Sequence, residues 1–162
     1  KKERHTAATV DMDTMANQIA YGPSAQRSMR EVNAALAAFD DEMTMHEEGG
    51  DIARINEAAG RGGAEVSDET VALLQKALGL SAQSEGAFAV TIAPLTLAWG
   101  VTSDAPRVPP QSEIDALLPL VNDAQLRING HPVELETEGM AVDPGGIAKG
   151  EACGVALEIS RG

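Results

Sequence analysis

The stretch from Ala141 to Gly150, AVDPGGIAKG, places an acid, two glycines and a lysine within a few residues of one another. An apolar run ends at Asp143, Pro144 and the glycines follow, and Lys149 comes one turn later. Glycines let the backbone approach a ligand closely because they carry no Cβ, and the unpaired amides that open a helix favour negative charge. This order suits a nucleotide with hydroxyls and a pyrophosphate. It also fits an ordinary turn in which Asp143 only caps the next helix.

The composition limits the kinds of partner. The 162 residues carry 25 acidic against 12 basic side chains, a net charge of −13. Such a balance argues against nucleic acid, whose phosphates need a basic surface, and against an anionic membrane surface. An anionic ligand would need a local positive feature or a metal ion. No apolar run is long enough to span a bilayer, and the single cysteine, Cys153, cannot form an internal disulfide.

Apolar residues recur every three or four positions in several segments, and this spacing predicts amphipathic helices. The clearest helix follows Ser24, which should cap it. Its expected core stripe consists of Met29, Val32, Leu36, Phe39 and Met43. Further helices are expected over residues 51–56, from a Ser67 cap to about residue 84, from a Ser112 cap to about residue 118, and over 146–160.

The remaining pattern predicts strands and loops. Residues 1–9 are expected to be a flexible lead-in and residues 10–21 a strand. Ala87 to Gly100 should have an extended piece before Pro94 and a short helix after it, anchored by Trp99. A β-meander is expected from Leu126–Ile128, Val133–Leu135 and Met140–Val142, with tight turns between them. The ordering is that of a mixed α+β protein: helices with an antiparallel meander.

Five stretches of the sequence resemble, in the same order, motifs of the ApbE family of FAD:protein FMN transferases. Met12-Asp13-Thr14 resembles Met-Gly-Thr, and Thr44-Met45-His46 followed by DIARIN resembles Ser-x-Tyr followed by Ser-Glu-Ile-x-x-x-Asn. GAFAVTIAPLTLAWG resembles Gly-Ala-Phe-Asp-x-Thr-x-x-Pro-Leu-x-x-x-Trp-Gly, and AVDPGGIAKG resembles the strongest motif of the family. The resemblance implies that residues 1–162 are the N-terminal portion of one ApbE-like, T-fold-like domain.

The resemblance also implies a chemistry. Family members bind FAD, use Mg²⁺ and transfer FMN to a threonine or serine hydroxyl of an acceptor flavoprotein, releasing AMP. The implied FAD-lining residues are Met12, His46, Ala87, Phe88, Ala89, Asp143 and Lys149. The Gly146 carbonyl is the implied metal ligand, and no catalytic residue is named. The implied location is the bacterial cell envelope or periplasm, at the membrane, although the sequence has no recognisable leader.

Departures from the family pattern keep other functions open. His46 replaces a tyrosine, Ala89 an aspartate, and Glu151 a tyrosine, which puts negative charge near the expected phosphates. The family's second half, which carries the acidic metal-binding motif, is missing here. We therefore expect a further segment, in cis or associated, beside Met140–Val142, and an inactive isolated chain. The alternatives are an FAD pyrophosphatase of the same fold and a non-catalytic flavin-binding or structural relative. Taken singly, Met12 fits a core position, and His46 a solvated helix end.

Overall fold

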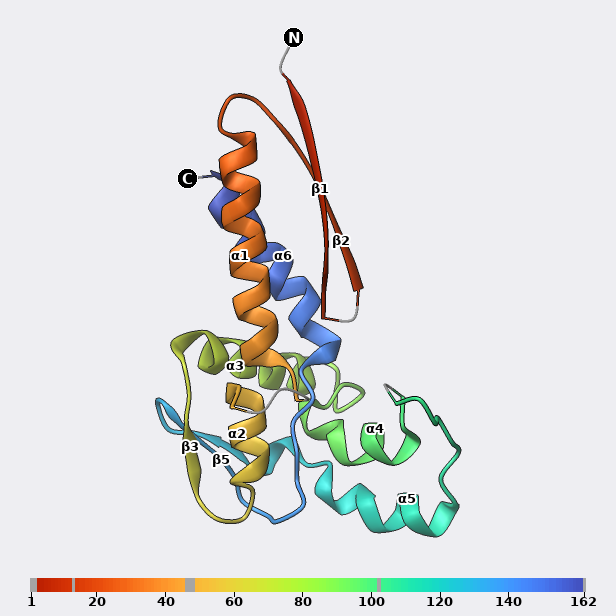
Figure 1. Ribbon diagram of the computed structural model, residues 1–162. Helices are drawn as coiled ribbons and strands as arrows, with labels where there is room; N and C mark the ends of the chain where they lie inside the picture. The colour runs from red at the N-terminus through yellow and green to blue at the C-terminus, as the bar shows by residue number, and fades with distance from the viewer. Residues whose placement is uncertain (1–2, 13, 46–48, 102, 162) are drawn as a thin grey trace.

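The computed structural model describes residues 3–12, 14–45, 49–101 and 103–161 (Figure 1). The helices and strands are β1 (Arg4–Asp11), β2 (Thr14–Tyr21), α1 (Ala25–Met43), α2 (Asp51–Glu57), β3 (Gly63–Glu65), α3 (Asp68–Gln83), α4 (Ala93–Trp99), α5 (Gln111–Leu117), β4 (Leu126–Ile128), β5 (Pro132–Leu135) and α6 (Gly145–Arg161). Three short 3-10 turns, η1 (Val90–Ile92), η2 (Leu118–Leu120) and η3 (Asp123–Gln125), lie between them. Helices combine with antiparallel sheets, which confirms the predicted α+β class.

The N-terminal region is a β-hairpin. β1 and β2 pair antiparallel from Arg4 opposite Tyr21 to Asp11 opposite Thr14, so the prediction of a flexible lead-in is wrong. The strand was missed because its half-buried positions are mostly small or polar residues, which give no apolar alternation. The outward face of the hairpin carries Val10, Met15, Ile19 and Tyr21, each between 58% and 76% exposed. Within the described part of the chain, no third strand pairs with this two-stranded sheet.

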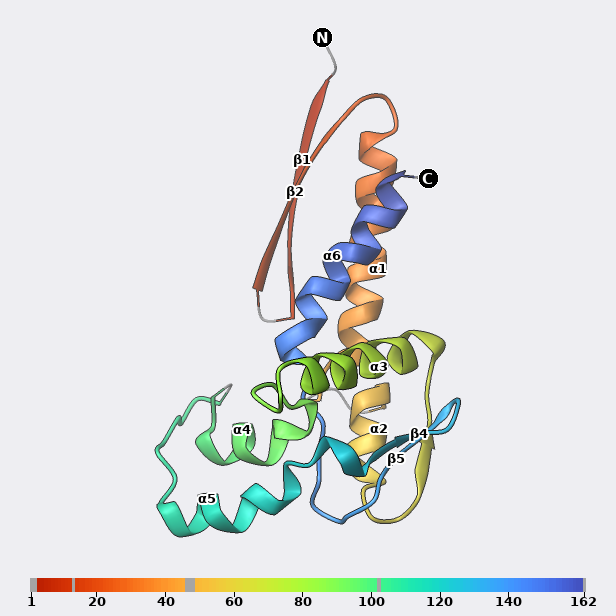
Figure 2. The same cartoon turned by 180° about the vertical axis from the view of Figure 1, so that it is seen from behind.

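α1 and α6 run side by side, and α3 crosses their ends (Figures 1 and 2). The fully buried part of the core lies around α3 and is formed mainly by α2, α3, η1, β5 and residues 140–142. All five residues of the predicted α1 stripe are buried, between 2% and 7% exposed. Ser24 precedes α1, but its side chain makes no capping hydrogen bond, so that detail is wrong. The Ser67 cap of α3 is confirmed, because its Oγ accepts from the Thr70 amide at 3.2 Å. Leu73 and Leu74 then carry α3 into the core with no exposed surface.

A buried acid ties α2 to the start of α3. Asp51 accepts hydrogen bonds from the Ser67 amide at 2.7 Å, the Ser67 hydroxyl at 2.7 Å and the Thr70 hydroxyl at 2.6 Å. It also pairs with Arg54. Burial alone would raise the pKa of Asp51, but these hydrogen bonds and the Arg54 charge outweigh it, so the pKa lies below its ordinary value.

The second sheet has the strand order β3-β5-β4, all antiparallel. Two of the three predicted meander strands are confirmed as β4 and β5. The third, Met140–Val142, is wrong: the segment is buried, with Met140 1% and Val142 0% exposed, but it is not a strand. Gly63–Glu65, for which the sequence predicted no strand, pairs with β5 as the third strand instead.

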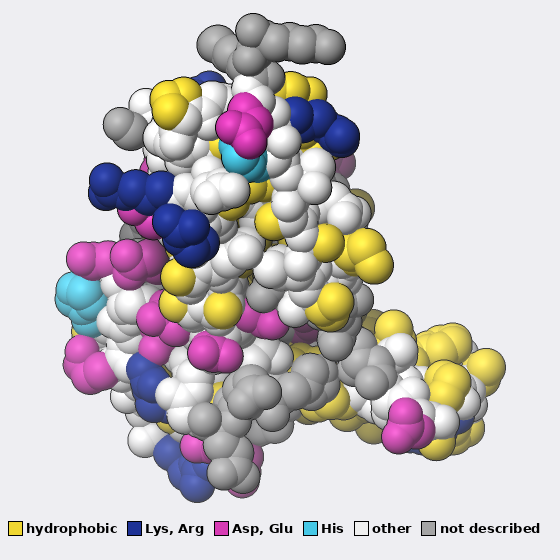
Figure 3. All heavy atoms as spheres, turned by 45° about the horizontal axis from the view of Figure 1, so that its top comes forward, with side chains coloured by type: hydrophobic (Ala, Val, Ile, Leu, Met, Phe, Trp, Pro, Cys, Tyr) yellow, Lys and Arg dark blue, Asp and Glu magenta, His cyan; other side chains and the backbone are white. Residues whose placement is uncertain are grey.

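The segment around Pro94 differs from the prediction in its first part. The expected extended piece includes the 3-10 turn η1, and the expected short helix is α4, which begins at Ala93. Trp99 is 37% exposed, so it is not a buried anchor. The helix α5 begins after Pro110 rather than at a Ser112 cap. Hydrophobic side chains gather on the surface of this lobe, at the right of Figure 3, where Leu97, Val101 and Val108 are between 57% and 78% exposed.

Candidate functional site

Two of the segments that carry predicted ligand residues meet at the start of α6. The Asp143 amide donates a hydrogen bond to the Val90 carbonyl at 2.8 Å, which joins the AVDPGGIAKG stretch to the end of the GAFAV stretch. The Phe88 ring lies against Gly146, because a Cβ built on Gly146 would come within 2.9 Å of Phe88 Cε2. The structure therefore brings together Phe88, Asp143 and Gly146, three residues that were predicted to belong to one site.

Asp143 caps the helix that follows it. Its Oδ1 accepts from the amide of Gly145, the first residue of α6, at 2.9 Å. The cap occupies one carboxylate oxygen, and Oδ2 makes no hydrogen bond with the described residues. The side chain is half-buried, so this second oxygen remains open to a further donor. The capping interpretation and the ligand interpretation of Asp143 are therefore compatible.

The amides at the start of α6 are less available than the sequence indicated. The Gly145 amide is bound by Asp143, and the Ile147 and Ala148 amides both donate to the Pro144 carbonyl at 2.9 Å. In this first turn, considering only described residues, the Gly146 amide is left without a hydrogen bond. Gly146 and Lys149 are both exposed residues. One amide and one ammonium, rather than a row of amides, are available to an anion here.

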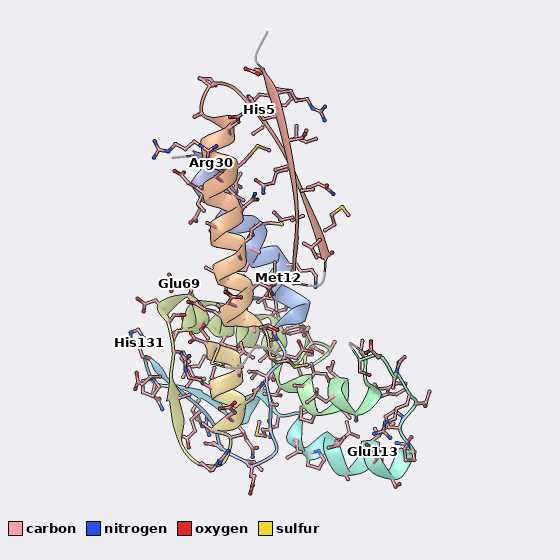
Figure 4. All side chains as sticks on the ribbon, in the orientation of Figure 1. His5, Met12, Arg30, Glu69, Glu113 and His131 are labelled. Carbon is pink, nitrogen blue, oxygen red and sulfur yellow. The ribbon has the colours of Figure 1, made fainter. Side chains whose placement is uncertain are left out.

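Met12 lies in the hairpin turn between β1 and β2 (Figure 4). Its φ is 52°, which is uncommon for a residue with a side chain, and its amide donates to Asp40 Oδ2 of α1 at 2.8 Å. The half-buried side chain packs against the hydrophobic core. Asp40 thus attaches the hairpin turn to α1. The packing of the Met12 side chain against the core agrees with the interpretation of Met12 as a core residue.

The other predicted ligand residues are placed as follows. Ala87 is exposed, and Ala89 is half-buried and extended, with φ −138° and ψ 129°, immediately before η1. The Phe88 amide donates to Ser84 Oγ at 3.0 Å, so the end of α3 holds this segment. His46 lies outside the described residues.

Asp123 holds the GAFAV segment from the other side, and no motif or spacing in the sequence predicted this role. Its Oδ2 accepts from the Val90 amide at 3.2 Å, and its Oδ1 accepts from the Thr91 amide at 3.0 Å and the Thr91 hydroxyl at 2.7 Å. Val90 and Thr91 are both 0% exposed, so these donors have no access to water in this structure. The contact spans 33 positions of the chain, which no local pattern reveals.

Asn56 holds the AVDPGGIAKG segment in a comparable way. Its Oδ1 accepts from the Val142 amide at 2.7 Å, and its Nδ2 donates to the Val142 carbonyl at 3.1 Å. A side-chain amide thus satisfies both backbone groups of one residue, as a neighbouring strand would. The backbone of Val142 is therefore bound by a side chain rather than by a strand of the described chain. Asn56 ends the DIARIN motif, which is the signal that could have singled it out.

Glu151 does not leave an uncompensated charge beside this site. Its Oε1 accepts a hydrogen bond from Lys76 Nζ of α3 at 2.5 Å. The expected negative charge near the phosphates is therefore paired. Lys76 was missed because it lies 75 positions away in the sequence.

The model of the ApbE family matches residues 9–162. The chain belongs to the ApbE family. Among curated proteins, it is 28% identical over 122 residues to an FAD:protein FMN transferase of Vibrio cholerae serotype O1, covering 74% of this chain and 36% of that protein. It is 32% identical over 117 residues to an FAD:protein FMN transferase of Klebsiella pneumoniae, covering 71% of this chain and 37% of that protein.

Solved ApbE structures have the same fold. The ApbE protein of Thermotoga maritima has a TM-score of 0.89 at 22% identity, covering 97% of this chain and 52% of that one. The flavin transferase ApbE of Vibrio cholerae also has a TM-score of 0.89, at 24% identity, covering 98% and 53%. The apo flavinyl transferase ApbE of Pseudomonas stutzeri has a TM-score of 0.85 at 27% identity, covering 98% and 52%. This chain therefore spans about half the length of the solved ApbE chains that it matches.

The described residues of this ApbE chain fit only part of a magnesium site. Within them, no group of three or more His, Cys, Asp or Glu side chains is placed to hold a metal ion. The Gly146 carbonyl and the Asp143 carboxylate are oxygen donors of the kind that Mg²⁺ accepts. Mg²⁺ needs near-octahedral coordination, usually with further carboxylates, water or substrate phosphates. Gly146 as a metal ligand remains a prediction.

Proposed function

We propose that this chain is the N-terminal portion of one flavin-transferase domain that moves FMN from FAD to a threonine or serine hydroxyl of an acceptor flavoprotein. Membership of the ApbE family and the names of its curated relatives support the reaction. The observation that carries the proposal for this chain is the Asp143–Val90 contact at 2.8 Å. It holds an aromatic ring, a half-free carboxylate and an unpaired helix amide together, which is a set of groups suited to a dinucleotide.

In the proposed reaction, the acceptor hydroxyl oxygen forms a bond to the phosphorus of the FMN half of FAD. The bond from that phosphorus to the bridging oxygen breaks, AMP leaves with the bridging oxygen, and the hydroxyl proton passes to solvent or to a base. Asp143 Oδ2 would accept from a nucleotide hydroxyl, and Lys149 with the Gly146 amide would face phosphate charge. Bound Mg²⁺ would offset the charge of the pyrophosphate, with the Gly146 carbonyl as one ligand.

The test is to incubate the full-length protein with FAD, Mg²⁺ and a flavoprotein acceptor, and to follow the acceptor by intact mass. We expect the acceptor to gain one FMN, and AMP to appear in equal amount. An acceptor with its target hydroxyl removed should gain nothing. Free FMN without modified acceptor would indicate a pyrophosphatase, and retained FAD with neither product would indicate a flavin-binding relative. Either result would contradict the proposal.

We also propose that residues 1–162 alone do not catalyse this reaction. They cover 36–37% of the curated relatives, and the described residues among them supply only part of a magnesium site. The predicted open edge at Met140–Val142 does not support this, because that segment is held by Asn56. The β1–β2 hairpin does support it, because no third strand of the described chain pairs with the hairpin and its apolar face is exposed. A two-stranded sheet rarely stands alone. Micromolar FAD binding with turnover by these residues alone would contradict the proposal.

The proposed location is the bacterial cell envelope, and only the family resemblance supports it. None of the described helices is long and apolar enough to cross a membrane. Cell fractionation of a strain that expresses the natural gene should place the protein in the periplasmic or membrane fraction. Recovery only with the cytoplasmic fraction would contradict this location.

A further inference from the structure

The side chain of Asn56 is bound to the backbone on which the candidate nucleotide site depends. Asn56 lies near the end of α2 and is half-buried. It makes two hydrogen bonds to Val142, one from the Val142 amide at 2.7 Å and one to its carbonyl at 3.1 Å, across 86 positions of the chain. Both atoms of the side-chain amide are therefore engaged with a single residue.

Val142 has little freedom to replace this partner. It is 0% exposed, so water cannot take over its amide and carbonyl without the segment moving outward. Met140, two residues earlier, is 1% exposed and fixes the same segment through its side chain. The Asn56 side chain thus makes the two backbone hydrogen bonds that a neighbouring strand would otherwise make to Val142.

The contact is transmitted to the site through one peptide. Asp143 follows Val142 directly, and its amide donates to the Val90 carbonyl at 2.8 Å. The same residue carries the carboxylate that caps α6. A shift of Val142 would therefore displace Asp143 relative to Val90 and Phe88, and would turn the first residues of α6 with it.

We infer that Asn56 is a positioning residue for flavin transfer. By hydrogen-bonding both backbone groups of Val142, it fixes the position of the Asp143–Gly146 turn relative to the Ala87–Val90 segment. The inference rests on the proposed function. Asn56 hydrogen-bonds Val142 and none of the predicted FAD-lining residues that the structure describes, so it acts through the backbone. Among side chains of this length, only an amide supplies a donor and an acceptor at the same spacing as a peptide group. Aspartate is the same size but lacks the donor when ionised.

The test compares Asn56→Asp with Asn129→Asp in the full-length protein. Asn129 is exposed in the turn before β5, so the control makes the same chemical change away from the site. Initial rates with FAD and an acceptor give kcat and KM at a temperature well below unfolding. Since small misplacements of reacting groups can cost on the order of 100-fold in rate, we expect N56D to lower kcat by about tenfold or more, with a smaller change in KM. N129D should match the wild type.

The pH profile separates positioning from mere stability. A protonated aspartic acid again offers one donor and one acceptor, so it can reproduce both contacts to Val142. The kcat of N56D relative to that of N129D should therefore rise as the pH falls through the pKa of the new carboxyl. Asn56→Gln is the second variant: its longer arm keeps both groups but pushes Val142 away, and it should lower kcat without this pH dependence.

Each outcome decides the inference. If N56D is folded and its kcat equals that of N129D at every pH, the inference is wrong. If N56D and N56Q are both unfolded at 10 °C, Asn56 serves stability alone and the inference is also wrong. If the wild type itself transfers no flavin, the proposed function has failed, which is a different result from a defect confined to the Asn56 variants.

Discussion

Replacing Asp123 by asparagine should loosen the turn that carries Phe88 and Val90, although the change removes only one charge and one acceptor. Asp123 accepts three hydrogen bonds from Val90 and Thr91, which are both fully buried. An asparagine oxygen at the Oδ1 position keeps both contacts to Thr91. Its NH₂ group then faces the Val90 amide, which is a donor at 3.2 Å from that position. Leaving one buried amide unpaired costs about 1–3 kcal/mol, and this is the expected loss in unfolding free energy.

The measurement is urea unfolding of the full-length protein, with Asp104→Asn as the control. Asp104 is exposed in the loop before α5, so the control removes the same charge without touching a buried donor. Thr91→Val extends the test, because it removes only the hydroxyl that donates to Asp123 Oδ1 at 2.7 Å. Because the bond that is lost is made to a carboxylate, that single change should cost about 1.5–3 kcal/mol. Since D123N weakens the same contact, the two changes together should cost less than their sum, by about 0.5 kcal/mol or more.

Two results would refute this reasoning. If D123N unfolds within about 0.5 kcal/mol of D104N, which is the ordinary spread of surface substitutions, the Val90 amide does not depend on Asp123. If the D123N and T91V losses simply add, the hydroxyl and the carboxylate are not acting on each other. A loss in D123N accompanied by a raised KM for FAD would further support the placement of this turn at the proposed flavin site.

Three other predictions concern neighbouring contacts. Gly146→Ala should be less stable than Gly150→Ala by about 1–3 kcal/mol in thermal or urea unfolding, because its Cβ meets Phe88 at 2.9 Å while a Cβ at Gly150 meets nothing within 4 Å; equal stability would show that the ring moves freely. Lys76→Ala should raise the KM for FAD by about two- to tenfold, because it leaves the Glu151 carboxylate unpaired. Adding Glu151→Gln should return the KM to the wild-type value. A KM that stays high in the double variant would indicate that Lys76 contacts the ligand itself. Because the folded pKa of Asp51 lies below 3.8, its contribution to stability is present above pH 3.8 and is lost as the pH falls through the folded pKa. The gap in unfolding free energy between the wild type and Asp51→Asn should therefore be widest near neutral pH and close in acid, and a gap that widens in acid would reverse the assignment.

The helices could be predicted because their buried residues recur as apolar residues at three- and four-residue spacing. The stripe from Met29 to Met43 and the Ser67 cap each follow from spacing or from one side chain, and both are seen in the structure. β1 could not be predicted in this way, because its half-buried residues include His5, Ala7 and Thr9 and show no apolar alternation. Met140–Val142 misled the prediction for the opposite reason: Met140 and Val142 are buried as in a strand, but the Asn56 side chain binds the Val142 backbone.

The sequence could indicate residues of the candidate site only where they lie together in one motif. AVDPGGIAKG indicated Asp143 and Gly146 by spacing, and the family resemblance added Phe88, which lies against Gly146. The supporting contacts were beyond reach, because each joins residues that are distant in sequence. Asp123 is 33 positions from Val90, and Lys76 is 75 positions from Glu151. Such pairs carry no periodicity, so only the folded chain shows them.

The hydrogen bonds between Asn56 and Val142 can form only late in the synthesis of the chain. The two residues are 86 positions apart, and at about 5–20 residues per second the second leaves the ribosome roughly 4–17 s after the first. The β1–β2 hairpin and α1 need only local contacts and can form in that interval, while contacts across long loops close late. Until then, the α1 stripe lacks α6 as a cover and the Asn56 amide has no partner. The nascent chain is therefore most exposed to aggregation and to chaperones in the seconds before its AVDPGGIAKG motif emerges.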